Sequence, residues 1–387
     1  MFFSNLLFIL FFPFFLYITV FIGRNLGFKG KFLVLLLIWH TSFCFLYYYM
    51  TEAMVSDLTG YWENSFTDSY DFSPGTAFVI SLTKIFSDKL GLSIENILLI
   101  YNFFGVIGLL LLGHVLLIFW PYKDKLRRNI PYIILLLPGM SFWTSVIGKD
   151  SIAFFAVCLA LFASINLKKR HYLFILASIV MFAVRPHIAA IMLISMTFSF
   201  TFEEKLPFLH KLVLLLIAST VNVSLIRFVL NYSGLGDTTS MADVTDYMGL
   251  RQGYNQEGGA GIDISSMSLP EQFFAYLFRP LFFDAPGILG IIVSFENCFT
   301  LTIFLPFFIK GIRKVFSRRP PGAIYNLIFL TLGLVVLATT TANLGISIRQ
   351  KTMLLPSLFY LIALSAYYIK TSKKTKGQGT AKISNAI

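Results

Sequence analysis

The sequence predicts an all-α, polytopic integral membrane protein with about 11 transmembrane helices and interfacial helices at its outer face. The 387-residue chain is 57% hydrophobic and only 13% charged, and its mean hydropathy is +0.76. This composition excludes a water-soluble globular protein. Apolar runs recur from end to end, and no long polar-patterned stretch interrupts them. Residues 1–387 are therefore expected to form a single membrane domain.

The spanning segments are predicted from apolar runs near the length of about 20 residues that a helix needs to cross a bilayer. They lie at residues 5–22, 31–50, 96–120, 131–147, 151–167, 172–185, 187–202, 211–231, 289–309, 323–341 and 352–370. The remaining residues connect these helices or follow the last one.

Two connecting segments are long enough to carry structure of their own. Residues 51–95 begin acidic and aromatic and become periodic from Phe78, with apolar residues on one helical face. This pattern predicts a helix lying on the outer leaflet. Residues 232–288 begin rich in Gly, Ser, Thr and Asp and end in "LPEQFFAYLFRPLFFDAPG", which predicts a re-entrant or interfacial segment.

The positions of lysine and arginine predict the orientation, because short cytoplasmic loops are enriched in both. With the segments above, the basic clusters all fall on one side. They are Arg24–Lys31, Lys123–Arg128, Lys168–Arg170, Lys205 with Lys211, Lys310–Arg319 and the tail from Lys370. This side is predicted to be cytoplasmic, and it includes the tail at residues 371–387. The net charge of +12 is thus explained by topology, and no nucleic-acid partner is expected.

Two hairpins place charged residues at the opposite, outer side. "FWTSVIGKDSIAFF" carries Lys149 and Asp150, and "FAVRPHIAA" carries Arg185 and His187. Residues 172–185 rise only about 21 Å as a helix, against a hydrocarbon core of about 30 Å, so these groups are expected in an outer depression. Structural alternatives remain: Arg185 as an interfacial anchor, His187 as a polar filler, and Lys149 and Asp150 as a mutually neutralising pair.

Arg279 in "YLFRPLFF" and Arg349 in "GISIRQK" are predicted to join them, although each also suits an interfacial anchor or an ordinary helix flank. Positive charge at membrane depth is costly unless it meets an anion. A lipid-linked phosphate or diphosphate is such an anion, because the arginine fork matches phosphate oxygens and lysine supplies compact charge.

The acidic and aromatic outer loop suits the sugar end of the same ligand. Asp57 and Glu63 lie there among Tyr61 and Trp62, and carboxylates bind sugar hydroxyls, although acids in outer loops are usually solvated. An acid or imidazole could then remove a proton from an acceptor hydroxyl while cations stabilise a departing diphosphate. This chemistry is glycosyl transfer from a polyprenyl carrier. The chain lacks GxGxxG and P-loop motifs, which disfavours a nucleotide-sugar donor. No cofactor or metal is expected.

Several phrases resemble the oligosaccharide repeat-unit polymerases (Wzy-type and EpsG-like) of bacterial surface-polysaccharide clusters, which are membrane glycosyltransferases similar to the GT-C class. They are "LLLPGMSFWTSVIGKDSIAFFAV", "FAVRPHIAAIML", "SDLTGYW", "YLFRPLFF" with "SFEN" after it, and "ISIRQKTMLLP". The resemblance implies polymerisation of undecaprenyl-diphosphate-linked repeat units at the outer face of the bacterial inner membrane.

The resemblance also assigns roles. Lys149, Arg185, Arg279 and Arg349 would hold the diphosphate, and Asp57 or His187 would move the proton. Apart from the resemblance, Glu63 is a further candidate for sugar binding and Asp150 a further candidate for catalysis. Membrane lipids are expected around the protein, and a chain-length regulator and a flippase of the same pathway are the other expected partners. A single-sugar transferase, a flippase that moves the lipid-linked oligosaccharide, and a glycan acyltransferase are the alternatives.

Overall fold

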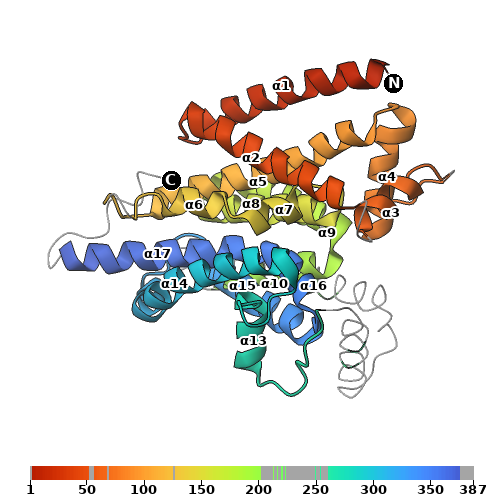
Figure 1. Ribbon diagram of the computed structural model, residues 1–387. Coiled ribbons are helices and arrows are strands. Elements are labelled where there is room, and N and C mark those ends of the chain that lie inside the picture. Colours follow the sequence, from red (N-terminus) through yellow and green to blue (C-terminus); the bar gives the residue numbers. More distant parts are fainter. Residues whose placement is uncertain are drawn as a thin grey trace. The chain divides into compact units, whose positions relative to one another are not determined.

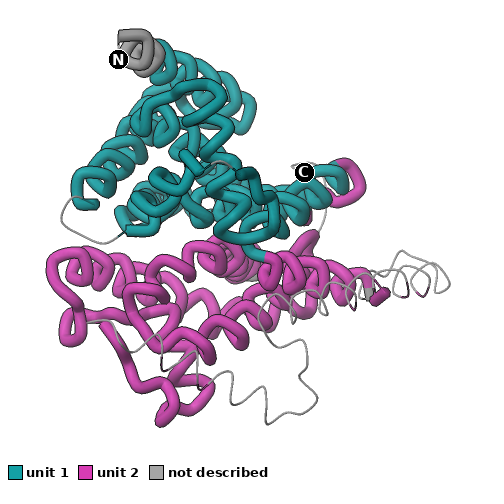
Figure 2. Tube along the Cα trace, turned by 90° about the vertical axis from the view of Figure 1, so that its right-hand side faces the viewer, with its two compact units in different colours: residues 1–163, 170–185 teal, residues 164–169, 186–387 magenta. Residues whose placement is uncertain are grey.

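Helices make up most of the described part of the chain in the computed structural model (Figure 1). The structure describes residues 2–51, 56–67, 69–124, 127–201 and 260–374, together with isolated positions between 212 and 253. Within these residues the only β-type pairing is an isolated antiparallel bridge between Gly261 and Asn343. The chain divides into two compact units, coloured separately in Figure 2, and each is described by itself.

Unit 1 contains residues 1–163 and 170–185. Its elements are α1 (Phe2–Asn25), α2 (Gly30–Met50), α3 (Asp57–Asn64), α4 (Thr76–Lys84), the π-helix η1 (Ile85–Lys89), α5 (Ile94–Phe119), α6 (Ile130–Leu135), α7 (Pro138–Thr144), most of α8 (Lys149–Ile165) and most of α9 (Leu167–Val184). The 26-residue α5 packs against α1, α2 and α6. Gly105 of α5 lies against the carbonyl oxygen of Thr144 and the ring of His40, and no space is left there for a Cβ atom. The small residue therefore permits close helix packing, as is common in membrane proteins.

Unit 2 contains residues 164–169 and 186–387. Its described elements are α10 (Pro186–Thr201), α13 (Leu269–Phe278), α14 (Gly287–Arg318), α15 (Ala323–Thr340), α16 (Leu344–Gln350), the 3₁₀-helix η2 (Lys351–Met353) and α17 (Leu355–Lys374). Helix α14 packs along α17, and α15 contacts both α10 and α17. Buried Asn326 of α15 donates to the Oγ of Ser164 at 3.2 Å and accepts from the Oγ of Ser357 at 2.8 Å. This polar bridge fixes α15 against α17 and the end of α8.

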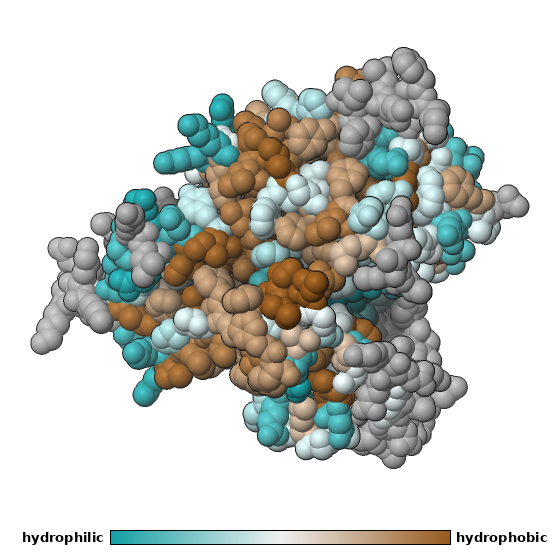
Figure 3. Space-filling view, viewed as in Figure 1, coloured by the Kyte–Doolittle hydropathy of each residue, from teal (hydrophilic) through white to brown (hydrophobic). Residues whose placement is uncertain are grey.

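Length and hydropathy identify four described helices that are able to cross a membrane, namely α2, α5, α14 and α15. A fifth is obtained if residues 344–353 and 355–371 form one span, bent by 60°. The sides of the helices carry mostly apolar side chains in the space-filling view, and hydrophilic side chains gather near helix ends (Figure 3). The helical membrane class is therefore supported, whereas the predicted count of about 11 spans is not confirmed.

The described helices differ from the predicted spans in several places. The run at 131–147 is divided into α6 and α7, because the chain is extended at Leu137 before Pro138, as expected of a residue that precedes proline. Helices α8 and α10 occupy the predicted segments at 151–167 and 187–202 but have only 17 and 16 residues. The predicted span at 211–231 and the glycine-rich start of the loop at 232–288 lie outside the described residues except for isolated positions, and the tail beyond residue 374 lies wholly outside them.

The helix predicted from Phe78 is present as α4 followed by η1, and the segment at 269–278 is α13. Their position at a membrane surface stays a prediction. Helix α13 begins with a capping box, in which the Ser268 backbone N–H and hydroxyl donate to the Glu271 carboxylate, each at 2.7 Å. These hydrogen bonds lower the pKa of Glu271.

Candidate functional site

Two helix ends carry the charged residues of unit 1. Helix α7 ends at Thr144, residues 145–148 form a bend, and α8 begins at Lys149. Helix α9 ends at Val184 because Pro186 disfavours helical backbone at the residue before it. Arg185 is therefore the first residue beyond α9, and its backbone N–H still donates to the carbonyl of Met181 at 2.7 Å.

Asp150 and Arg185 form a buried ion pair across these two helix ends. The Nη2 atom of Arg185 donates to Oδ1 of Asp150 at 2.5 Å, and the side chains are only 9% and 7% exposed, respectively. The Nε atom of Arg185 is also buried, and no described atom accepts its hydrogen bond. The charge of Arg185 is thus already balanced by a carboxylate, which differs from the expectation of a cation that meets only a ligand.

Lys149 lies next to this pair and contacts the segment at residues 51–95. Its Nζ donates to Oγ1 of Thr76, the first residue of α4, at 3.0 Å. Gly75 precedes Thr76 with a φ of 102°, in the left-handed region that glycine tolerates, and its N–H donates to the carbonyl of Ala183 at 2.9 Å. The starts of α4 and α8 and the end of α9 are therefore joined by hydrogen bonds.

Helix α3 places Asp57, one of the two acidic residues predicted to bind or react with substrate, on the side that faces the start of α8. Ser56 caps α3 by accepting from the N–H of Leu58 at 3.1 Å, and exposed Asp57 is the first residue of the helix. Buried Tyr61 follows four residues later, and its ring lies beside Gly148, 3.6 Å from the position that a Cβ would take there. Residues four apart share a helix face, so Asp57 lies on the side of α3 that faces the start of α8. Glu63 is exposed and two residues beyond Tyr61, so it lies on another face.

Arg279 occupies the end of α13 in unit 2. Its Nε donates to the carboxylate of Asp284, and the Arg279 side chain is 20% exposed. Arg279, Glu271 and Phe274 line one side of a cavity of about 460 Å³. This arginine is also ion-paired, but it remains accessible from the cavity.

Lys351 is a second buried cation of unit 2, which the sequence pattern indicated only as a neighbour of Arg349. Its Nζ donates to Oδ1 of Asn297 at 2.6 Å and to the carbonyl of Leu277 at 3.2 Å. The Nδ2 of Asn297 donates in turn to the carbonyl of Pro280 at 2.8 Å. Arg349 is half-buried at the end of α16. In the sequence, the only signal that could have predicted this network is that Lys351 follows two residues after Arg349 in an otherwise apolar run.

Glu296 precedes Asn297 and interacts electrostatically with Lys351. Half-buried His187 is the second residue of α10. The predicted site residues are thus distributed over both units, with His187, Arg279 and Arg349 in unit 2 and the others in unit 1.

Within the described residues there is no group of three or more His, Cys, Asp or Glu side chains arranged to hold a metal ion. Comparison with known proteins gives no match to a protein family, a curated protein or a solved structure. The site must therefore be interpreted from its own chemistry.

Proposed function

We propose that the protein is a membrane glycosyltransferase that polymerises polyprenyl-diphosphate-linked oligosaccharide repeat units for a bacterial surface polysaccharide. The observation that carries this proposal is the buried Asp150–Arg185 pair beside Lys149. Charges inside an apolar helical protein are expensive to retain, and a buried pair adds little stability over apolar packing. These charged residues are explained if the function requires the guanidinium of Arg185 to be held in place beside the accessible ammonium group of Lys149.

The cations of each unit match one of the two substrates of such a reaction. Both the growing chain and the incoming repeat unit carry a polyprenyl diphosphate. Lys149 and Arg185 in unit 1 supply one set of phosphate ligands, with the Nε–H of Arg185 still available. Arg279 and Arg349 in unit 2 supply the other. Arginine and lysine both bind phosphate oxygens strongly, arginine through its fork and lysine as a point charge.

The transfer step needs a base for the acceptor hydroxyl. That oxygen attacks the anomeric carbon of the donor sugar, its proton passes to the base, and the bond from the anomeric carbon to the diphosphate oxygen breaks, so that the diphosphate leaves with the electron pair. Exposed Asp57 or half-buried His187 takes the proton, and Glu63 contacts sugar. Asp150 already accepts from Arg185, so its role is to position the arginine and not to act as the base.

The topology that goes with this function has about 11 spans in one membrane domain. The basic clusters and the C-terminal tail face the cytoplasm of the inner membrane, as the distribution of lysine and arginine favours. The starts of α4 and α8 and the end of α9 then face outward, where lipid-linked repeat units are joined. Membrane lipids surround the protein, and a chain-length regulator and a flippase act in the same pathway.

The test is polymerisation by the purified full-length protein in lipid vesicles that contain polyprenyl-diphosphate-linked repeat units. We expect a ladder of lengthened products, lost in Lys149→Ala and Arg185→Lys and retained in Arg313→Ala, which removes an exposed cation of α14. Addition of a single sugar would identify a single-sugar transferase instead. Transport of unchanged substrate across the bilayer would identify a flippase, and either result overturns the polymerase.

A further inference from the structure

A second cationic cavity lies in unit 1, away from the hydrogen-bonded helix ends described above. It has a volume of about 490 Å³, within the usual range of small-molecule pockets. The lining residues are Lys29, Phe32, Leu117, Trp120, Tyr122, Lys123, Arg128, Asn129 and Tyr132. None of the roles proposed above uses any of them.

The cavity lies where two membrane-spanning helices end. Lys29 immediately precedes α2, and Trp120 immediately follows α5, and both helices are long and apolar enough to cross a bilayer. Asn129 precedes α6, which supplies Tyr132. Tryptophan and tyrosine are typical of the boundary between hydrocarbon and headgroups, so the lining fits a site at that boundary.

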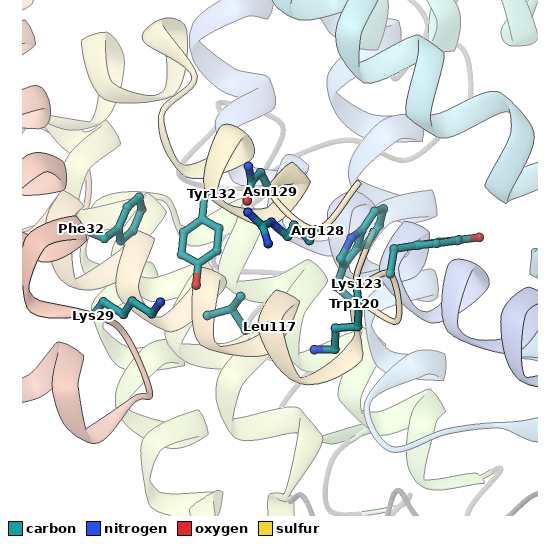
Figure 4. Close-up of a pocket in the computed structure, with 9 residues that line it drawn as sticks. Lys29, Phe32, Leu117, Trp120, Lys123, Arg128, Asn129 and Tyr132 are labelled. Atoms are coloured by element: carbon teal, nitrogen blue, oxygen red, sulfur yellow. The ribbon is translucent and has the colours of Figure 1, made fainter. Parts of the chain in front are cut away.

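Three cations share the cavity and form no ion pair with any described carboxylate. Lys29, Lys123 and Arg128 are all exposed, and Figure 4 shows their charged ends directed toward a common space bordered by Tyr132 and Leu117. The ion pairs among the described residues of unit 1 involve other cations. Like charges brought together in this way repel one another unless an anion lies between them.

The described residues of the segment that carries Lys123 and Arg128 contact one another. Trp120 donates through Nε1 to the carbonyl of Arg127 at 2.7 Å. The guanidinium of Arg127 lies 4.2 Å above the ring of Tyr122, and its Nε donates to Asp124 at 3.0 Å. Arg127 thus neutralises the nearby acid. Lys123 and Arg128 remain available to a ligand.

The walls are apolar and aromatic, which distinguishes this cavity from an ordinary cluster of basic loop residues. The rings of Phe32 and Tyr132 meet edge to face with centroids 4.7 Å apart, and Trp120 and Tyr122 form a second pair at 5.6 Å. Leu117, one turn inside α5, continues the wall along the spanning helix. A ligand that fits has an anionic group for the cations and a hydrocarbon part for these walls.

We propose that this cavity binds the phosphate-bearing headgroup of an anionic phospholipid, whose acyl chains follow the apolar surface of α2 and α5. Lys29, Lys123 and Arg128 bind the phosphate, and the hydroxyl of Tyr132 and the amide of Asn129 bind headgroup hydroxyls. Basic pockets at the ends of spanning helices are well suited to such headgroups. The site is separate from that of the sugar transfer reaction and serves to hold a lipid at the edge of unit 1.

Native mass spectrometry of the full-length protein tests the proposal, with phosphatidylglycerol and zwitterionic phosphatidylcholine as probes. We expect retention of phosphatidylglycerol over phosphatidylcholine, and an affinity lower by roughly a hundredfold in a Lys29→Gln, Lys123→Gln, Arg128→Gln variant, since each cation near a membrane surface contributes about 1 kcal/mol. The matched control is Lys310→Gln, Arg313→Gln, Lys314→Gln on α14, which removes the same charge and should retain the lipid.

Two results would overturn the assignment. Equal loss of lipid in both triple variants would mean that binding follows net charge and not this cavity. Binding of inorganic phosphate or glycerol 3-phosphate as tightly as the intact lipid would identify a soluble phosphate ligand, since the apolar walls would then contribute nothing. Circular dichroism of each variant establishes that the helices are retained, which is expected because Lys314 is half-buried and the other five substituted side chains are exposed.

Discussion

The Nη2 atom of Arg185 lies 2.5 Å from Oδ1 of Asp150, and this contact joins the end of α9 to the start of α8. The two residues are 35 positions apart in the sequence. Both side chains are buried, so removal of either one leaves an uncompensated charge in an apolar environment. The pair is therefore a requirement for the local structure as well as for the proposed chemistry.

Arg185→Ala is predicted to destabilise the protein by about 3–5 kcal/mol, the usual cost of breaking a buried ion pair on one side. Replacing both partners, as in Asp150→Leu with Arg185→Met, should restore much of that stability because no charge is left unpaired. Thermal unfolding in detergent measures both variants. Recovery of stability without recovery of sugar transfer would separate the structural role from the functional one. A double variant as unstable as Arg185→Ala would contradict this account of the pair.

Lys149→Ala is predicted to change stability by less than about 1 kcal/mol, because the ammonium group is partly exposed and makes a surface-type contact with Thr76. The same change should lower sugar transfer by about 100-fold or more, since it removes a charge that stabilises the leaving diphosphate. Thr76→Val removes only the hydroxyl that orients Lys149 and should have a smaller effect. Steady-state rates with the two variants test this order, and equal rates for wild type and Lys149→Ala would remove Lys149 from the site.

The positions of the four described helices that are long and apolar enough to cross a membrane were predictable from apolar runs alone. The run predicted at 31–50 is α2 (Gly30–Met50), and that at 323–341 is α15 (Ala323–Thr340). Helix α14 continues past the predicted end at residue 309 to Arg318, because the basic residues there are good helix formers that suit a polar helix end. Hydropathy detects the apolar part of a helix and misses such an extension.

The arrangement of charges was predictable only in part. The sequence placed Lys149 and Arg185 in two short hairpins on one side, but pairing within the site depends on how the hairpins pack. From the sequence, one alternative for Asp150 was an ion pair with its neighbour Lys149. In the structure, Asp150 forms an ion pair with Arg185 of the other predicted hairpin. Likewise, burial of Lys351 against Asn297 follows from the packing of η2 on α13 and α14, which no local pattern specifies.

Substitutions at Asn297 are predicted to report on Lys351. Asn297→Leu removes the acceptor at 2.6 Å from the buried ammonium and should cost about 2–4 kcal/mol, since one N–H of the charged group loses its acceptor while the bond to the Leu277 carbonyl remains. Asn297→Asp keeps an acceptor and adds opposite charge, so it should be clearly more stable than Asn297→Leu, although the hydrogen bond to Pro280 is lost. Thermal unfolding of the two variants compares them directly. The opposite order would mean that Lys351 finds another partner.

Gly311 allows a close approach between α14 and α17 in unit 2. A Cβ at this position would lie 2.5 Å from the Cβ of Ser365 and 2.8 Å from its Cα, and the second contact involves backbone that cannot rotate away. Gly311→Ala is therefore predicted to separate the two helices and to destabilise unit 2 by about 1–3 kcal/mol through overpacking.

The matched control for Gly311→Ala is Gly60→Ala in α3, where a new Cβ meets no atom within 4 Å. Alanine should stabilise that helix by about 0.5–1 kcal/mol, because glycine loses more backbone entropy on folding. Ser365→Gly combined with Gly311→Ala removes the Cβ contact and should recover part of the lost stability. Unfolding temperatures of the three variants measure these differences. If Gly311→Ala were as stable as Gly60→Ala, then α14 and α17 would not pack as closely as the structure has them.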